Sequence, residues 1–172
     1  MKRITMIKAH LYLSAIAAPF ILMMALTGTF YLFNIKGSEE VNVIKTIQLS
    51  KADLTQEVIT NELKGIDKSY TFEYVKKVSY GAITRPTTRA YYKFKQVPNG
   101  IEVSHIRPDL LRKLIEVHKG HSSSIVKTYE KAVGIFLFLI VLTGLYLAFT
   151  MKREKKLVVG LFLVGCLIFF FL

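Results

Sequence analysis

Apolar residues along this chain gather in three long uncharged runs that enclose a segment of mixed polar and apolar residues. The runs extend over Ala9–Phe33, 132–150 and 157–172. An α-helix needs about 20 apolar residues to cross the hydrocarbon core of a bilayer. The first two runs have about this length, whereas the third has only 16 residues. The pattern predicts three transmembrane helices, over residues 9–33, 129–150 and 157–172.

Basic residues near these runs predict the orientation of the helices. Three lie within residues 1–8, and four lie in the short 151–156 loop between the second and third runs. Short cytoplasmic loops of membrane proteins are enriched in Lys and Arg, whereas long segments cross the membrane largely regardless of charge. We therefore expect residues 1–8 and 151–156 to be cytoplasmic, and the 34–128 segment and the C-terminus to be extracytoplasmic.

The 34–128 segment has the pattern of a small α+β domain. Strand-like composition covers 41–49, and alternating polar and apolar residues follow around 71–80, 92–95 and 101–105. The sequence Pro98-Asn99-Gly100 is typical of a turn between two strands.

Two helices are predicted in the same segment. Apolar residues at helical spacing between Leu54 and Leu63 predict an amphipathic helix, which Gly65 is expected to end. Pro108-Asp109 is expected to begin a second helix, and Gly120 to end it. The expected order is β-α-β-β-β-α, in which a helix lies across one face of a small antiparallel sheet.

Charge and cysteine content narrow the classes of function. The 172 residues carry a net charge of +12, which could indicate a nucleic-acid-binding protein. The segment between the apolar runs shows no nucleic-acid-binding motif, so we expect no nucleic acid as a partner. The apolar runs themselves predict the lipid bilayer as a partner. Cys166 is the only cysteine, which excludes an intrachain disulfide and a Cys-x-x-Cys-His attachment site for c-type haem.

Short motifs recur around the first two apolar runs. The motifs are His10-Leu11-Tyr12-Leu13, Pro19 and Leu26-Thr27-Gly28 in the first run, His118-Lys119-Gly120-His121 before the second, and Leu142-Thr143-Gly144-Leu145-Tyr146-Leu147 within it. With these motifs, nearly the whole chain resembles the PepSY-associated transmembrane family of bacterial inner-membrane proteins.

The resemblance implies a place in the bacterial inner membrane and a PepSY-like domain outside it. Larger relatives include inner-membrane reductases linked to siderophore-iron uptake, in which histidines at the helix ends are thought to hold b-type haem. This chain departs from those relatives because it is much shorter and has three expected spans rather than four or more.

His10, His118 and His121 are accordingly candidate ligands of haem b. A membrane b-haem usually takes two imidazoles at one depth. His10 is expected near the cytoplasmic end of the first span, and the other two histidines near the outer end of the second, so the two ends cannot share a haem. A sharp bend at Gly120 would let His118 and His121 face one iron, whereas His10 would need a partner from another subunit. Each histidine also has a structural interpretation. His10 can be an interfacial residue at a helix start, His118 a side chain packed on the apolar stripe of its helix, and His121 a loop residue.

Thr27, Gly28, Thr143 and Gly144 are predicted to serve helix packing, because small residues let membrane helices approach closely and a threonine hydroxyl can bond the backbone or a neighbour. The alternative is that each glycine makes room for a flat cofactor.

Glu116 with His118 and His121 also suggests a metal site, but no fourth ligand is evident and no metal is expected.

Two functional hypotheses follow from these residues. The first is a b-haem electron-transfer or reductase-associated subunit of the iron or siderophore-reduction type, so the chain is at most a redox subunit. The second is a non-enzymatic membrane-anchored module that binds or regulates another envelope protein. Both hypotheses predict a partner, which is either another membrane protein or a second copy of the chain. The sequence contains no hydrolytic motif.

Overall fold

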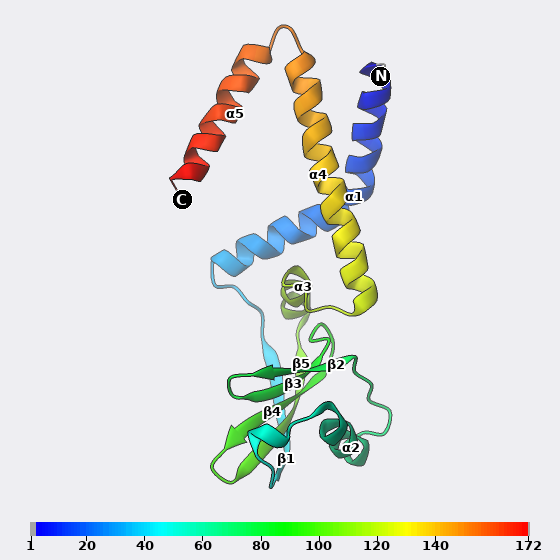
Figure 1. Ribbon diagram of the computed structural model, residues 1–172, viewed down its shortest axis with the longest axis vertical. Coiled ribbons are helices and arrows are strands. Elements are labelled where there is room, and N and C mark those ends of the chain that lie inside the picture. The colour runs from blue at the N-terminus through cyan, green and yellow to red at the C-terminus, as the bar shows by residue number, and fades with distance from the viewer. Residues whose placement is uncertain (1–2, 172) are drawn as a thin grey trace. The chain divides into compact units, whose positions relative to one another are not determined.

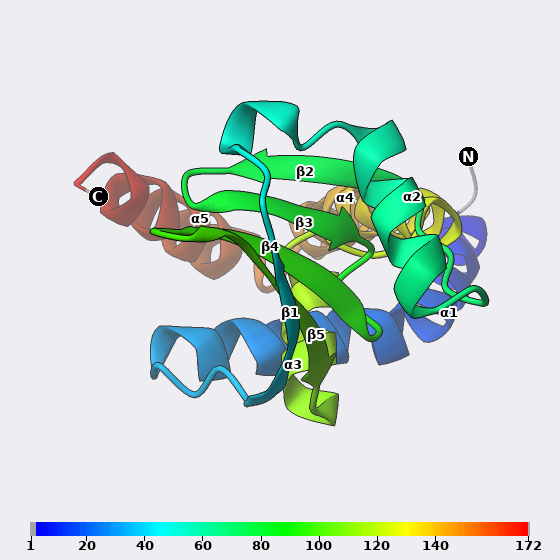
Figure 2. The same ribbon diagram turned by 90° about the horizontal axis from the view of Figure 1, so that it is seen from below.

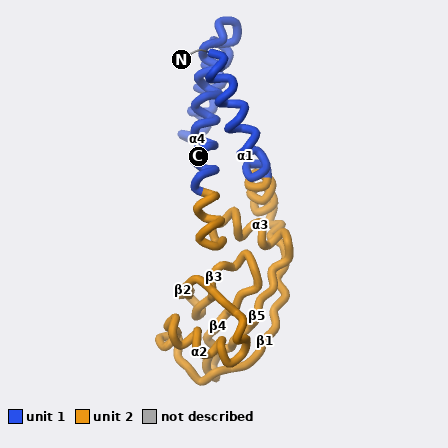
Figure 3. The backbone as a smooth tube through the Cα atoms, turned by 90° about the vertical axis from the view of Figure 1, so that its right-hand side faces the viewer, with its two compact units in different colours: residues 1–22, 131–172 blue, residues 23–130 orange. Residues whose placement is uncertain are grey.

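A computed structural model describes residues 3–171 of the chain (Figure 1). Residues 1–2, at the expected cytoplasmic N-terminus, and residue 172, at the end of the third expected span, lie outside the described residues. The chain divides into two compact units (Figure 3). Unit 1 comprises Met1–Leu22 and Lys131–Leu172, and unit 2 comprises Met23–Glu130.

Unit 2 contains an antiparallel five-stranded sheet, which confirms the expected α+β class of this segment. The strand order is β1-β5-β4-β3-β2. The strands are β1 (Glu39–Ile47), β2 (Tyr74–Val78), β3 (Gly81–Arg85), β4 (Tyr91–Val97) and β5 (Gly100–Pro108). Gly100 has a φ of +126° where the turn between β4 and β5 ends, a conformation that favours glycine. The turn is the one that Pro98-Asn99-Gly100 predicts.

Helix α2 (Gln56–Ile66) covers one face of this sheet (Figure 2). Thr55 caps it by accepting a hydrogen bond from the backbone N–H of Val58. Its apolar stripe is buried against alternating residues of the central strands. The resulting core consists of Leu54, Ile59, Leu63, Ala82, Tyr92, Phe94, Ile101 and Val103. This burial of apolar area stabilises the domain without a disulfide.

Helix α3 (Leu110–His118) follows β5 directly, with Asp109 as its N-cap. The Asp109 carboxylate accepts hydrogen bonds from the backbone N–H of Arg112 at 2.7 Å and from the backbone N–H of Ser38 at 2.8 Å. Gly37 has a φ of +68°, and a Cβ atom there would lie 2.5 Å from the backbone nitrogen of Arg112. The linker before β1 is thereby fixed against the first turn of α3.

Two helices of the described chain are long and apolar enough to cross a membrane, α1 (Arg3–Leu32) and α4 (Ser124–Thr150). Helix α5 (Lys155–Phe170) is also apolar but has only 16 residues. Two candidate spans are thus present where the sequence predicts three, because a third helix of this length covers only about 24 Å. The short 3₁₀ helix η1 (Lys51–Asp53) completes the described elements.

The structure differs from the predicted order of elements in two places. The sequence predicts four strands, whereas the sheet has five, since β3 forms a hairpin with β2. Every residue of β3 is buried, so both of its faces are covered and the alternation that identifies a half-exposed strand is missing. Gly65 lies inside α2, which continues to Ile66 instead of ending at the glycine.

Candidate functional site

In unit 1, helix α1 places His10 against helix α4. The Nδ1 atom of His10 lies 2.9 Å from Oγ1 of Thr143. The Thr143 hydroxyl also lies 2.7 Å from the backbone carbonyl oxygen of Leu139, one turn earlier in α4. A threonine inside a helix can make this backbone bond because its hydroxyl reaches the preceding turn. His10 and Thr143 are 133 positions apart in the chain, so the contact joins two helices that are distant in the sequence.

Unit 2 contains a second contact of the same kind. The Nδ1 atom of His118, the last residue of α3, lies 3.2 Å from Oγ1 of Thr27, near the C-terminal end of α1. The Thr27 hydroxyl lies 2.8 Å from the backbone carbonyl oxygen of Met23, again one turn earlier. Both threonines belong to a Leu-Thr-Gly motif. The chain therefore has two histidine–threonine pairs with one common geometry, which we call the inner pair (His10, Thr143) and the outer pair (His118, Thr27).

The threonine contacts determine which ring nitrogen carries the proton. Two oxygens 2.7–2.8 Å apart need a proton between them, and a carbonyl oxygen has none to give, so each threonine donates its single proton to the backbone. The hydroxyl can then only accept from the imidazole, which means that Nδ1 of His10 and of His118 carries the hydrogen. In the neutral ring, Nε2 is left with a free lone pair.

The glycine after each threonine gives the imidazole room. A Cβ atom at Gly28 would lie 3.0 Å from Cε1 of His118, and one at Gly144 would lie 3.3 Å from Cε1 of His10. Any larger side chain would push the ring away from its threonine. The four residues predicted to pack helices therefore all contact a histidine.

His121 lies outside these pairs and contacts Glu116 of α3. The Nδ1 atom of His121 is 2.7 Å from Oε2 of Glu116, whose side chain is only 5% exposed. The same carboxylate accepts a hydrogen bond from Thr87 at 2.6 Å and from Lys119 at 3.0 Å. The Arg85 guanidinium lies 3.5 Å away. Glu116 is thus the centre of a buried cluster that joins α3 to the loop after β3 and to the chain before α4.

The surroundings of this cluster shift two pKa values. Burial raises the pKa of Glu116, but hydrogen bonds from Thr87, Lys119 and His121 outweigh it and bring the pKa down to about 2. Burial also lowers the pKa of His121 below its ordinary value of 6.5, and this effect exceeds the opposing hydrogen bond to Glu116. Glu116 is therefore ionised and His121 neutral at pH 7, with Nδ1–H donating to the carboxylate.

Two further members of this cluster, Arg85 and Thr87, belong to no motif that sequence reasoning could single out. Arg85 is 4% exposed, and its Nη1 donates to Oγ1 of Thr87 at 2.6 Å. Its Nε is a buried nitrogen with no hydrogen-bond partner among the described residues. A buried guanidinium needs a nearby carboxylate, so the ion pair with Glu116 is what makes this position tolerable.

The structure brings the candidate residues together in pairs and not in one cluster. Glu116 and His121 meet, but His118 is directed to Thr27, and the described residues contain no group of three or more His, Cys, Asp or Glu side chains that could hold a metal ion.

No protein-family model matches the chain, and no curated protein or solved structure matches it.

Proposed function

We propose that this chain is a bacterial inner-membrane protein that binds b-type haem through its histidines and acts as an electron-transfer or reductase-associated subunit. The observation that carries the proposal is the geometry shared by the inner pair and the outer pair. Each imidazole is anchored through Nδ1–H and keeps the Nε2 lone pair for a ligand.

This donor chemistry fits haem iron. Histidines that bind metals usually donate their other ring N–H to a fixed acceptor, which sets the tautomer and the orientation of the ring. The threonines supply that acceptor here, and Gly28 and Gly144 let each ring come close enough to reach its threonine. His121, whose Nδ1–H is held by Glu116, meets the same requirement and is the third candidate ligand. When bound, b-type haem would supply a one-electron redox centre.

A second histidine to hold the haem would have to come from outside each pair. The inner pair contains the single histidine His10, so its partner imidazole would belong to a second copy of the chain or to another membrane protein. At the outer end, His118 and His121 are both available. The proposal therefore includes assembly with a second subunit.

The membrane setting is supported by α1 and α4, which are long and apolar enough to cross a bilayer. In the proposed topology, residues 1–8 and 151–156 are cytoplasmic, the sheet domain is a PepSY-like extracytoplasmic domain, and α5 forms a third span. The 16 residues of α5 would require local thinning of the bilayer.

A second candidate function is a non-enzymatic, membrane-anchored binding module. It is favoured by the fact that each histidine–threonine hydrogen bond already links two helices. Hydrogen bonds of this kind stabilise membrane helix contacts by about 0.6–2 kcal/mol, so the pairs have a structural role without any cofactor.

A visible spectrum decides between the two candidates. The protein would be purified in mild detergent from haem-replete cells, and the dithionite-reduced minus oxidised spectrum recorded for the native chain and for His10→Ala, His118→Ala and His121→Ala. His105→Ala is the matched control, because His105 packs against Tyr92 in the sheet, with ring centres 4.9 Å apart.

The haem proposal predicts a sharp α-band that is lost in His10→Ala or His118→Ala and kept in His105→Ala. A flat spectrum of the native protein would overturn the proposal and favour the binding module. A band that persists in all three candidate variants would assign the haem to other residues.

A further inference from the structure

Large apolar side chains of unit 2 are exposed at the points where the sheet domain meets the two candidate spans. Phe33 and Ile35 follow α1, Leu110 is the first residue of α3, and Ile125 lies in the first turn of α4. Leu110 is 72% exposed and Ile125 is 84% exposed. Single exposed apolar residues are normal on a protein surface, but several gathered at one place indicate a contact surface.

The exposed apolar surface of α1 continues into the linker that follows it. Asn34 has a φ of +60°, and the Ile35 N–H donates to the backbone carbonyl oxygen of Phe30 at 2.9 Å. A left-handed residue followed by such a hydrogen bond is a common end of a helix, and it turns the chain back on the last helical turn. Phe33 and Ile35 therefore stay beside Leu32, which is also exposed.

Leu110 joins the same corner of unit 2 from α3. The Ser38 N–H donates to the Asp109 carboxylate at 2.8 Å, and the Asp109 N–H donates to the Ser38 carbonyl oxygen at 3.0 Å. Gly37, two residues after Ile35, approaches the first turn of α3 so closely that it has no room for a Cβ atom. Helix α3 thus begins next to the linker, and Leu110 lies at the corner where α1 ends.

Tyr31 and two lysines have the side chains expected at a membrane–water boundary. The Lys36 ammonium group lies 5.1 Å from the centre of the Tyr31 ring, and that of Lys119, which also donates to Glu116, lies 6.0 Å from it. Tyrosine rings are enriched at the level of the lipid headgroups, and lysines extend their ammonium groups from apolar surface into this layer. The end of α1 and the end of α3 therefore both carry interfacial side chains.

Ile125 is exposed at the start of α4 although this helix end is firmly held. Glu73 accepts hydrogen bonds from the Ser124 N–H at 3.1 Å and from the Ser124 hydroxyl at 2.7 Å. The exposed position of Ile125 thus belongs to the folded domain and not to a frayed helix end. From this residue onward, α4 leads into the apolar stretch that is long enough to cross a bilayer.

We propose that unit 2 contacts the lipid bilayer through Leu110 and Ile125, with α3 lying in the headgroup region. The corner at Leu110 continues the exposed apolar surface of α1, and Ile125 continues that of α4, so the lipid around the two spans also covers these side chains. Leu110 precedes and Ile125 follows His118 in the chain, which places the outer pair at the depth of the headgroups. This inference rests on the proposed membrane location but not on haem binding.

A quencher carried by the lipid tests the contact. In a Cys166→Ser background, Leu110→Cys and Ile125→Cys are labelled with an environment-sensitive NBD fluorophore, and the full-length protein is placed in phosphatidylcholine nanodiscs. Lipid with a spin label on its acyl chain, just below the headgroup, should quench both labels, and their emission should shift to shorter wavelengths than in water. Ile135→Cys, in the proposed span α4, is the positive control.

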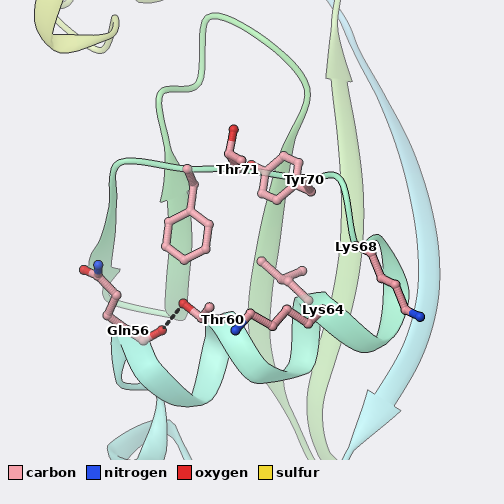
Figure 4. Close-up of a pocket in the computed structure, with 8 residues that line it drawn as sticks. Gln56, Thr60, Lys64, Lys68, Tyr70 and Thr71 are labelled. Carbon is pink, nitrogen blue, oxygen red and sulfur yellow. Dashed lines mark hydrogen bonds between the residues drawn. The ribbon is translucent and has the colours of Figure 1, made fainter.

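Two positions elsewhere in the domain are negative controls. Val43→Cys replaces an apolar residue of β1 that is 52% exposed but adjoins neither span. Lys64→Cys lies at the hollow beside α2 (Figure 4), and α2 is at the end of unit 2 away from α3 (Figures 1 and 3). Both labels should keep their fluorescence in spin-labelled lipid and lose it to iodide added to the water.

The outcomes separate the lipid contact from the membrane location. If the Ile135 label is quenched but the Leu110 or the Ile125 label is not, the contact is overturned and the span remains. Quenching at Val43 equal to that at Leu110 would also overturn it, because the domain would then meet the bilayer through β1. If the Ile135 label is not quenched, the membrane location fails and the inference fails with it.

Discussion

Gly28 lies so close to His118 that a Cβ atom on it would be 3.0 Å from Cε1 of the imidazole. This distance is tighter than ordinary van der Waals contact, so a methyl group requires the ring to move away from Thr27. We expect Gly28→Ala to weaken the outer pair by about 1 kcal/mol, the usual net contribution of one hydrogen bond. The thermal unfolding midpoint in detergent and the haem content per chain should both fall.

Alanine substitutions at two other glycines serve as comparisons for Gly28→Ala. Gly144→Ala should have a smaller effect, because a Cβ atom there would lie 3.3 Å from His10. Gly134→Ala should be neutral or slightly stabilising, since a Cβ atom at that helical position meets nothing within 4 Å. Equal effects at Gly28 and Gly134 would show that the space beside the imidazole is not what matters.

The assignment of the ring protons is directly measurable. In protein labelled with ¹⁵N-histidine and free of haem, NMR should report the Nδ1–H tautomer for His10 and His118 at pH 8. Thr143→Val removes the acceptor and should release His10 to the mixture of tautomers found in a free ring, whereas Thr143→Ser should retain the native signal. An Nε2–H signal for His10 in the native chain would refute the proposed orientation of the inner pair.

Glu116 should be among the most sensitive positions of the sheet domain. Glu116→Gln removes the charge beside the buried Arg85 and leaves the guanidinium without compensation. Breaking a buried ion pair in this way destabilises a protein by about 3–5 kcal/mol. Urea denaturation in mild detergent, followed by near-ultraviolet circular dichroism, measures this loss.

Glu62→Gln is the control for that substitution. Glu62 pairs with Lys45 at 2.7 Å, but the two side chains are 32% and 39% exposed. An exposed pair contributes about 1 kcal/mol or less. If both variants lost the same stability, the buried cluster would have no special role.

The cluster should also make the domain sensitive to acid. The folded pKa of Glu116 is about 2, below its ordinary 4.5, and the folded pKa of His121 is below 6.5. Because both pKa values are lower in the folded state, the stabilisation is complete above pH 6.5 and is lost as the pH falls, first through His121 and then through Glu116. His121→Asn should remove the first of these losses. A stability profile of the native chain that stays flat between pH 7 and pH 3 would contradict this expectation.

Cysteine labelling tests the proposed topology. In a Cys166→Ser background, Glu57→Cys on the exposed side of α2 should react with a membrane-impermeant maleimide in intact spheroplasts. Lys152→Cys, in the loop between α4 and α5, should react only after permeabilisation. The reverse pattern would invert the proposed orientation, and reaction of both in intact cells would exclude it.

Local chemistry made much of the sheet domain predictable. Asp109 caps α3 and Gly100 takes the positive φ that the turn requires, because these residue types satisfy needs that involve only nearby backbone. The strand β3 was missed for a related reason. Its five residues, Gly81–Arg85, are buried on both faces, so nothing in their polarity distinguishes one face from the other.

The candidate site was predictable only in its parts. His10, His118, Thr27 and Thr143 each stand out in the sequence, but the outer pair joins positions 91 residues apart and the inner pair 133. Periodicity carries no information on contacts over such distances. The repeated Leu-Thr-Gly was the one visible signal that two similar environments exist, whereas Arg85 becomes notable only through its contact with Glu116.

The pairing of β1 with β5 places the two ends of the sheet segment side by side, which determines how the segment could be replaced by another domain. Glu39, the first residue of β1, pairs with Pro108, the last residue of β5, so the sheet begins and ends at one point. A segment whose two ends are adjacent can be cut out and replaced without displacing the chain on either side. A short linker could therefore join the two boundaries of residues 39–108, but a domain put in their place would have to replace the contacts that Arg85 and Thr87 make with Glu116 of α3.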